Sequence, residues 1–356
     1  MKFWKLDKEF PQIIADLKAR QNKIKKSLNE KRHRRKAGVS ADKEVREVRI
    51  MKVKGVNLGN WLVLEKWMSP ALFAGTTAED EYYLPRQLSK EVYEARIKIH
   101  RSEYITERDF VTIKSMGMEA VRIPVPYFIF GDREPFIGCI EELDKAFNWA
   151  EAYGLQILID LHTAPLGQNG FDNGGICGVC KWSKHPEEVE FVLSVLERLA
   201  ERYGERKGLW GIEVINEPVT ENMWETMKVP ERYPAVDPEL AEGSGPVTLD
   251  FLRGFYKDAY DRIRKYMPEE KYVVIHDGFE LKAWKGYIAG RKVQECSPGY
   301  PSVSDGCRGK WLRADNGRIS EVYQRTFSER YSGNGRIFPG DLRRMVPVQF
   351  SGLWMG

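Results

Sequence analysis

The chain has 356 residues, enough for one large domain or two ordinary ones, and 42% of them are hydrophobic. This fraction supports a buried core and excludes an intrinsically disordered chain. The formal net charge at pH 7 is only +4, so the overall charge gives no reason to expect a nucleic-acid partner.

The N-terminal segment differs in character from the middle of the chain. Residues 1–50 are strongly charged and contain a basic run at residues 31–36, which favours a solvated extension over a surface for nucleic acid or anionic lipid. Met51 stands directly before the first expected strand and is an alternative start. No segment is long and apolar enough to span a membrane, and the first residues lack the apolar core of a secretory signal. We therefore expect a cytoplasmic monomer with no membrane or nucleic-acid partner.

Residues 51–288 alternate short β-rich runs with longer helical patterns, which is typical of βα units and a parallel sheet. The expected strands are residues 55–59, 120–125, 156–160, 209–215 and 272–276. Apolar residues at i, i+3, i+4 and i+7 mark the helices between them, as at Leu143, Ala146, Phe147 and Ala150. A capping box is predicted at Thr106 and Asp109. Three helices are predicted to end at glycines, namely Gly117, Gly154 and Gly204.

Cys177 and Cys180 form a C-x-x-C pair in the middle of a glycine-rich segment. No second pair or nearby His completes a zinc site, so the pattern favours a structural loop over a metal centre.

Polar residues follow the carboxyl ends of the expected strands, and in a barrel these ends converge on the face where active sites form. Cleavage of a glycosidic bond needs two carboxyl groups, of which one protonates the leaving oxygen. Glu217 follows the fourth strand within Asn216-Glu217-Pro218, where partial burial would keep it protonated near neutral pH. Asn216 is placed to hydrogen-bond a sugar 2-hydroxyl.

Five segments of residues 51–288 carry a family pattern at family-like spacing. They are GVNLGNWLVLEKW at 55–67, VRIP at 121–124, DLH at 160–162, NEP at 216–218 and HDGF at 276–279. Together they resemble glycoside hydrolase family 5, in the branch close to the exo-β-1,3-glucanases. The resemblance implies an α/β fold on the (β/α)8 TIM-barrel plan. It also implies a retaining hydrolase of β-glucosides or β-glucans that uses no metal and no organic cofactor.

The resemblance also implies roles for single residues. Glu217 would be the acid/base, and Arg122 would orient the nucleophile, with a structural ion pair as the alternative. Glu65 would hold the terminal sugar or form a salt bridge, and His162 would line the subsite of the cleaved glucose or lie in the core. Three tryptophans could stack on sugar rings or belong to the core: Trp61, Trp67 and Trp182. The expected substrate-binding residues are Glu65, Arg122, His162, Asn216, His276 and Trp61.

Residues 289–356 show no apolar periodicity and no G-E-W segment, in which this family carries its nucleophilic Glu. We therefore expect about five βα units of an incomplete barrel, and an enzyme impaired by the lack of its nucleophile. A catalytically inactive barrel that binds β-glucan is the alternative. Reading the codons of residues 292–306 and 338–346 one nucleotide later permits D-I-H-Q-Y and G-E-W, the segments that the family places there. The sequence thus favours a tail that is translated out of frame over a tail that forms a divergent domain.

Overall fold

The computed structural model describes residues 53–284 and three short strands further on, β6 (Val293–Gln294), β7 (Val346–Val348) and β8 (Leu353–Met355). The chain divides into two units, Met1–Arg49 and Ile50–Gly356, and all described residues belong to the second. The predictions for residues 1–50, and for the tail beyond these three strands, lie outside the described residues.

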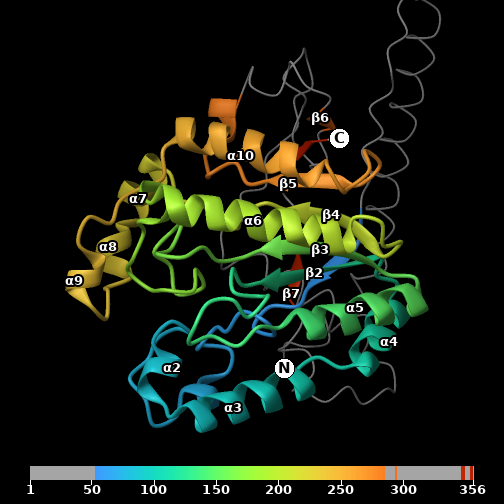
Figure 1. Cartoon of the computed structure of the whole chain (residues 1–356), viewed down its shortest axis with the longest axis horizontal. Helices are drawn as coiled ribbons and strands as arrows, with labels where there is room; N and C mark the ends of the chain where they lie inside the picture. Colours follow the sequence, from blue (N-terminus) through green and yellow to red (C-terminus); the bar gives the residue numbers. More distant parts are fainter. Residues whose placement is uncertain (1–52, 285–292, 295–345, 349–352, 356) are drawn as a thin grey trace, which may run out of the picture. The chain divides into compact units, whose positions relative to one another are not determined.

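Five parallel strands form the centre of the sheet, and neighbours in sequence are neighbours in space (Figure 1). They are β1 (Gly55–Asn57), β2 (Ala120–Val125), β3 (Gln156–Leu161), β4 (Leu209–Glu213) and β5 (Tyr272–Ile275). Each begins at the predicted residue. The short strands pair antiparallel at the two edges: β7 lies along β1, and β8 lies between β5 and β6. In the described part of the chain, the structure thus holds five parallel strands of a (β/α)8 plan, an incomplete barrel.

The central strands are buried on both faces, as expected for parallel strands covered by helices. β2 is buried along its whole length and pairs with β3 in continuous register from Ala120 opposite Gln156 to Val125 opposite Leu161. The register between these two strands determines which residues of β2 and β3 lie side by side at the carboxyl end of the sheet.

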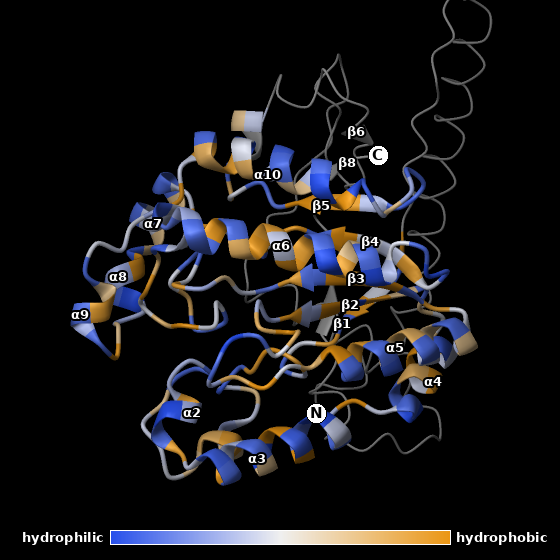
Figure 2. Ribbon diagram, in the orientation of Figure 1, coloured by the Kyte–Doolittle hydropathy of each residue, from blue (hydrophilic) through white to orange (hydrophobic). Residues whose placement is uncertain are grey.

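Helices connect the strands and cover the sheet, with apolar stripes beside polar ones (Figure 2). The longer helices are α3 (Lys90–Glu103), α4 (Glu107–Ser115), α5 (Ile140–Tyr153), α6 (Pro186–Tyr203) and α10 (Leu249–Ile263). The shorter ones are η1 (Pro70–Phe73), α2 (Leu84–Gln87), η2 (Trp182–Lys184), α7 (Glu221–Met227), α8 (Val229–Arg232), α9 (Pro238–Ala241) and η3 (Leu281–Trp284). None of the helices in the described ranges combines the length and the apolar character needed to cross a membrane.

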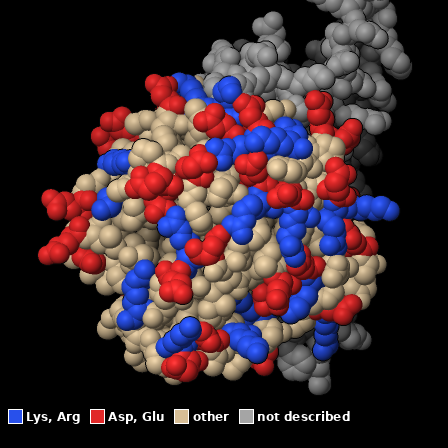
Figure 3. All heavy atoms as spheres, viewed as in Figure 1, with Lys and Arg blue, Asp and Glu red and all other residues tan. Residues whose placement is uncertain are grey.

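Ion pairs link the outer helices to one another. Arg202 of α6 binds Asp144 of α5, and Arg262 of α10 binds Glu190 of α6. Figure 3 shows acidic and basic side chains interspersed over this face of the molecule. The pairs are solvent-exposed, so each contributes at most about 1 kcal/mol, and the buried apolar stripes hold the layers together.

The predicted helix ends are confirmed, but the reason for glycine at the end of α6 differs from the one expected. Thr106 and Asp109 form the capping box of α4, with the Thr106 amide donating to Asp109 Oδ2 at 2.7 Å. Gly117 and Gly154 adopt positive φ angles of 76° and 65° after α4 and α5. Gly204 ends α6 with an ordinary φ of −51°, and glycine is needed there because a Cβ would lie 2.3 Å from the Tyr266 carbonyl oxygen.

Candidate active site

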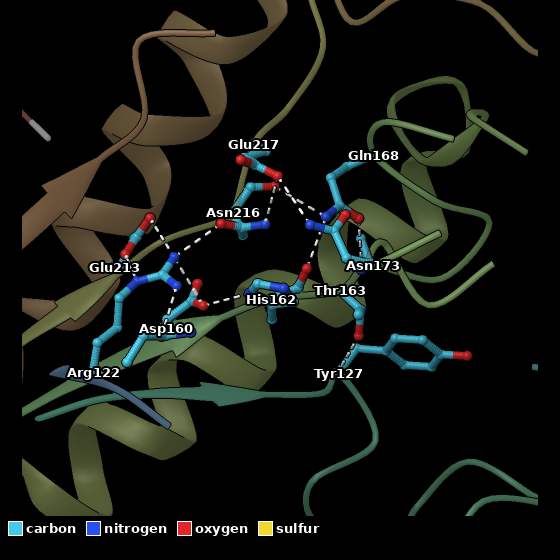
Figure 4. Close-up of polar contacts among 12 residues, drawn as sticks. Arg122, Tyr127, Asp160, His162, Thr163, Gln168, Asn173, Glu213, Asn216 and Glu217 are labelled. Atoms are coloured by element: carbon cyan, nitrogen blue, oxygen red, sulfur yellow. Dashed lines mark hydrogen bonds and ion pairs between the residues drawn. The ribbon is translucent and has the colours of Figure 1, made fainter. Parts of the chain in front are cut away.

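Polar side chains from β2, β3 and β4 meet at the carboxyl end of the sheet (Figure 4). Arg122 comes from β2, Asp160 and His162 from β3 and the turn after it, and Glu213 from the last position of β4. All four are buried. The strand-end convergence predicted from the sequence is therefore present.

Arg122 is the centre of this buried network. Its guanidinium donates to Glu213 from Nε at 2.8 Å and from Nη2 at 3.1 Å, and Nη2 lies 2.9 Å from Asp160 Oδ2. Nη2 also donates to Asn216 Oδ1 at 2.9 Å, and Nη1 donates to Asn57 Oδ1 at 3.2 Å. Burial opposes the charge, but the two carboxylates outweigh it and raise the pKa of Arg122. Arg122 thus makes the structural ion pair, while its action on a nucleophile stays a prediction.

His162 is held by the same aspartate. Its Nδ1 lies 2.5 Å from Asp160 Oδ2, so Nδ1 is protonated and donates a hydrogen bond to the carboxylate. Burial lowers the pKa of His162, but the Asp160 carboxylate raises it by more, and the net shift is upward. This tautomer leaves Nε2 as the ring atom that can meet a ligand.

Glu217 occupies an unusual backbone conformation directly after the buried residues Val214 to Asn216. Its φ is 44°, a left-handed value that costs a non-glycine residue about 1–3 kcal/mol and is concentrated at functional sites. The half-buried carboxylate accepts hydrogen bonds on Oε2 from Asn173 Nδ2 at 3.2 Å and from Asn216 Nδ2 at 3.4 Å. The strained turn therefore aims Glu217 at the loop that carries Asn173.

Glu65 lies at the rim of the same site. Its amide donates to Asn60 Oδ1 at 2.8 Å, and its Oε2 accepts from Trp67 Nε1 at 3.0 Å. Burial raises the pKa of Glu65; His162 opposes this rise, while the carboxylate of Glu217 adds to it. The salt-bridge alternative is not seen among the described residues, where the adjacent Lys66 pairs with Glu79 instead.

The three tryptophans divide between core and surface. The prediction that Trp61 binds substrate is wrong: it is 1% exposed, packs in the main core and donates Nε1 to the Arg101 carbonyl at 2.9 Å. The preceding residue, Asn60, has a φ of 60° and turns the chain at this point. Trp182 is also buried, whereas Trp67 is 65% exposed beside Glu65.

His276 supports the turn after β5. Its Nδ1 accepts from the Gly278 amide at 3.0 Å, and its ring meets Phe279 edge-on at 4.8 Å between centroids. Because Nδ1 is engaged by the backbone, a direct contact of His276 with substrate would have to use Nε2 and stays a prediction.

Several residues of the site were not assigned a role from the sequence. Glu213 and Asp160 hold Arg122, Asn173 binds Glu217, and Gln168 joins the backbones of His162 and Asn216 through Nε2 at 2.8 and 3.0 Å. The segment QNGFDNGG at 168–175 was the available signal. Its density of amide and glycine residues, a few residues after a buried strand, is typical of a binding loop.

Cys177 and Cys180 are free thiols buried in the adjacent loop. Burial raises the pKa of both to about 12, which keeps them protonated and unreactive. Their backbones tie loops together: the Cys177 amide donates to Asp80 Oδ2 at 2.7 Å, and the Cys180 amide donates to Ser244 Oγ at 3.1 Å. Within the described ranges, no cluster of three or more His, Cys, Asp or Glu side chains is arranged to hold a metal ion.

Comparison with known proteins gives a family match over much of the chain. Residues 89–305 match the family model for cellulase (glycosyl hydrolase family 5). A probable glucan 1,3-beta-glucosidase A of Emericella nidulans is 38% identical over 267 residues, which cover 73% of this chain and 60% of that protein. The glucan 1,3-beta-glucosidase of Candida oleophila is 36% identical over 246 residues, covering 64% and 52%. The chain thus spans about half to three fifths of the length of these relatives.

A solved structure shares the fold. The rutinosidase from Aspergillus niger superposes with a TM-score of 0.54 at 21% sequence identity, over 68% of this chain and 67% of the other. At this level of identity, the likeness concerns the fold alone.

Proposed function

Because this chain belongs to glycosyl hydrolase family 5, we propose that its site binds β-glucosides and protonates the glycosidic oxygen through Glu217. The observation that carries the proposal is the placement of the Glu217 carboxyl group. It stands at the carboxyl end of the sheet, in a strained turn, between two amide donors and next to the Arg122 network. The names of the relatives, glucan 1,3-beta-glucosidases, support β-1,3-linked glucose as the substrate class.

The neighbouring side chains supply the contacts that a glucose ring needs. Asn216 has its Oδ1 fixed by Arg122, so its Nδ2 faces Glu217 and the substrate 2-hydroxyl. His162 presents Nε2, and Glu65 offers a carboxylate for sugar hydroxyls beside the exposed face of Trp67. Such a set binds one glucose ring by hydrogen bonds around its edge and by apolar contact with its face.

In a retaining mechanism, a second carboxylate about 5–5.5 Å from the acid attacks the anomeric carbon. Asp160 and Glu213 are poor nucleophiles because both are buried against the Arg122 guanidinium. The sequence contains no G-E-W segment. We therefore propose that this chain retains the acid/base half of the mechanism and turns over slowly unless a nucleophile is supplied.

An external nucleophile tests whether the chain keeps a working acid but lacks a nucleophile. The full chain would be incubated with laminaribiose with and without sodium azide, and the products identified by NMR. Azide should accelerate glucose release and yield the α-glucosyl azide, because it attacks the face that a missing carboxylate leaves open, while the departing sugar oxygen still needs a proton from Glu217. Glu217→Gln should reduce this reaction by about 10²-fold through loss of the acid. Glu79→Gln, which changes an exposed acid paired with Lys66, should not reduce it.

Three results would contradict the proposal in different ways. Rapid hydrolysis without azide, with retention of the β configuration, would show that the chain has its own nucleophile. An azide-dependent rate that is unchanged in Glu217→Gln would remove Glu217 from the acid role. Binding of β-1,3-linked glucose without any azide product would favour the binding-protein alternative.

A further inference from the structure

The connection from β4 to α10, residues 214–248, is far longer than the roughly 2–6 residues usual for such loops. Residues 221–241 within it form α7, α8 and α9, which we call the insert. Figure 1 shows the insert at the end toward which the arrows of β2 and β3 point, the end that carries Glu217. Long loops with structure of their own at this end of a barrel are where substrate selection is built.

The insert is packed tightly against the loop that follows β3. A Cβ on Gly178 would lie 2.4 Å from Ala235 Cα, and a Cβ on Gly170 would lie 3.2 Å from a methyl carbon of Val229. Directly after the insert, the Gly245 amide donates to the Cys180 carbonyl at 3.0 Å. These contacts make the insert a fixed wall of the site.

The insert and the loop share a small apolar cluster beside Glu217. Its buried members are Phe171, Val219 and Val229, and half-buried residues pack on it: Met223, Trp224, Met227, Tyr233 and Phe279. Phe171 is two residues from Asn173, which binds the Glu217 carboxylate. The Tyr233 and Phe171 rings are in contact, with their centroids 5.0 Å apart and their planes tilted by 40°.

Tyr233 stands out in this cluster because its ring contacts Phe171, which is two residues from the asparagine that binds Glu217. It is half-buried, so part of its ring can meet a ligand. Burial raises the pKa of Tyr233, Arg232 opposes this rise, and the carboxylates of Asp172 and Glu217 add to it, which places the phenol within electrostatic reach of both.

We propose that Tyr233 is a specificity-determining residue for the leaving group of the substrate. A general acid must come within about 2.6–3.2 Å of the oxygen that it protonates, so the Glu217 carboxyl marks the glycosidic oxygen. The group beyond that oxygen then lies beside the insert, where the Tyr233 ring, supported by Phe171, offers a flat aromatic face. The part of the substrate that this face contacts is a flat ring with an apolar face, either a second glucose or an aromatic aglycone. This inference rests on the proposed function.

Binding measurements on the full chain test it without requiring turnover. The ligands are methyl β-glucoside, which has almost no leaving group, laminaribiose and phenyl β-glucoside, titrated by calorimetry. The wild type should bind at least one of the two larger ligands more tightly than the methyl glucoside. Tyr233→Ala should weaken that ligand by about three- to tenfold and leave methyl β-glucoside unchanged. Tyr233→Phe should retain the advantage, and Tyr266→Ala, at an exposed tyrosine after α10, should behave as the wild type.

Each outcome has a distinct meaning. If Tyr233→Ala loses affinity only for laminaribiose, the preferred partner of the tyrosine is a sugar. If it loses affinity only for phenyl β-glucoside, the preferred partner is an aromatic ring. An unchanged ratio in Tyr233→Ala, or an equal loss for all three ligands, overturns the inference while the proposed function stands. A wild type that binds none of the three overturns both. Circular dichroism of each variant confirms that it is folded.

Discussion

At the scale of single residues, Asp160 links two of the predicted site residues. One carboxylate oxygen serves both Nη2 of Arg122 and Nδ1 of His162. The sequence places Asp160 at the end of an apolar strand but gives no hint that it joins two functional residues, because Arg122 comes from a different strand. That link depends on the register between β2 and β3.

Replacing Asp160 with Asn should lower the pKa of His162, since burial then acts without the opposing carboxylate. In the wild type this pKa is raised above its ordinary value of about 6.5. The stability that charged His162 contributes is therefore complete below that pH and is lost as the pH rises through the raised value. The variant should lose about 1.5–3 kcal/mol of unfolding free energy at pH 6, and this deficit should shrink at higher pH.

NMR titration of the imidazole signals and urea unfolding at several pH values measure both effects. Glu187→Gln is the matched control, because it removes the carboxylate partner of His185, an exposed histidine at the same i, i+2 spacing. An identical His162 titration in wild type and Asp160→Asn would contradict the assignment.

The two tryptophans after β1 give a second prediction at this scale. Trp61→Ala should cost about 3–5 kcal/mol of stability, because it empties a buried site. Trp67→Ala should change stability by less than about 0.5 kcal/mol, as is usual on the surface, and should weaken binding of methyl β-glucoside. Thermal unfolding and calorimetry separate the two. A stable Trp61→Ala variant with impaired binding would restore Trp61 to the site.

The sequence could not make this distinction on its own. Trp61 and Trp67 follow the same strand within a few residues of one another, and both lie in a segment that resembles the family. The positive φ of Asn60 marks a turn of the chain directly before Trp61. Asparagine can adopt a positive φ, but the residue type alone does not predict that it will. By contrast, Glu217 was predicted correctly to follow the fourth strand, because the apolar run before it contains β4 and the buried residues after it.

At the scale of elements, three of the long helices were predicted from their apolar periodicity, whereas α3 and the insert were not. α5, α6 and α10 each carry a repeated apolar stripe, and every parallel strand begins at the residue predicted for it. α7, α8 and α9 are too short for such a period to develop. They exist because the loop after β3 gives them a surface to pack on, and that surface is a tertiary property.

Gly178 provides a test of how firmly the insert is held. Gly178 and Gly117 share a φ of 76°, but a Cβ at Gly117 meets nothing within 4 Å, whereas one at Gly178 meets the backbone of Ala235. Gly117→Ala should therefore cost only the left-handed strain, about 1–2 kcal/mol. Gly178→Ala should cost about 1–3 kcal/mol more from overpacking. It should also weaken laminaribiose binding, whereas Gly117→Ala should not. If urea unfolding shows equal losses of stability for Gly178→Ala and Gly117→Ala, the insert can move aside to accommodate the added methyl group.

At the scale of the whole molecule, the described parallel sheet stops at five strands. A (β/α)8 barrel closes only when its eighth strand pairs with the first, and each open edge presents unpaired backbone groups. In the described residues, β1 and β5 are instead flanked by the antiparallel strands β7 and β8. The sequence predicted the five strands from their apolar runs. The loss of periodicity near residue 289 also predicts that the βα alternation ends there, and most of that segment lies outside the described residues.

Reading the tail one nucleotide later should complete the fold and the site. The shifted frame permits D-I-H-Q-Y within residues 292–306 and G-E-W within residues 338–346, and its Trp is forced by Met345-Val346. A chain translated in that frame should have a higher thermal midpoint, because closure of the barrel buries both sheet edges. Its Glu would supply the covalent step, so it should hydrolyse β-1,3-linked glucose without azide. The coding sequence decides first, since an early stop codon in the shifted frame would end the hypothesis. Laminaribiose hydrolysis and thermal unfolding of the two chains decide next, with a chain shifted by two nucleotides as the control.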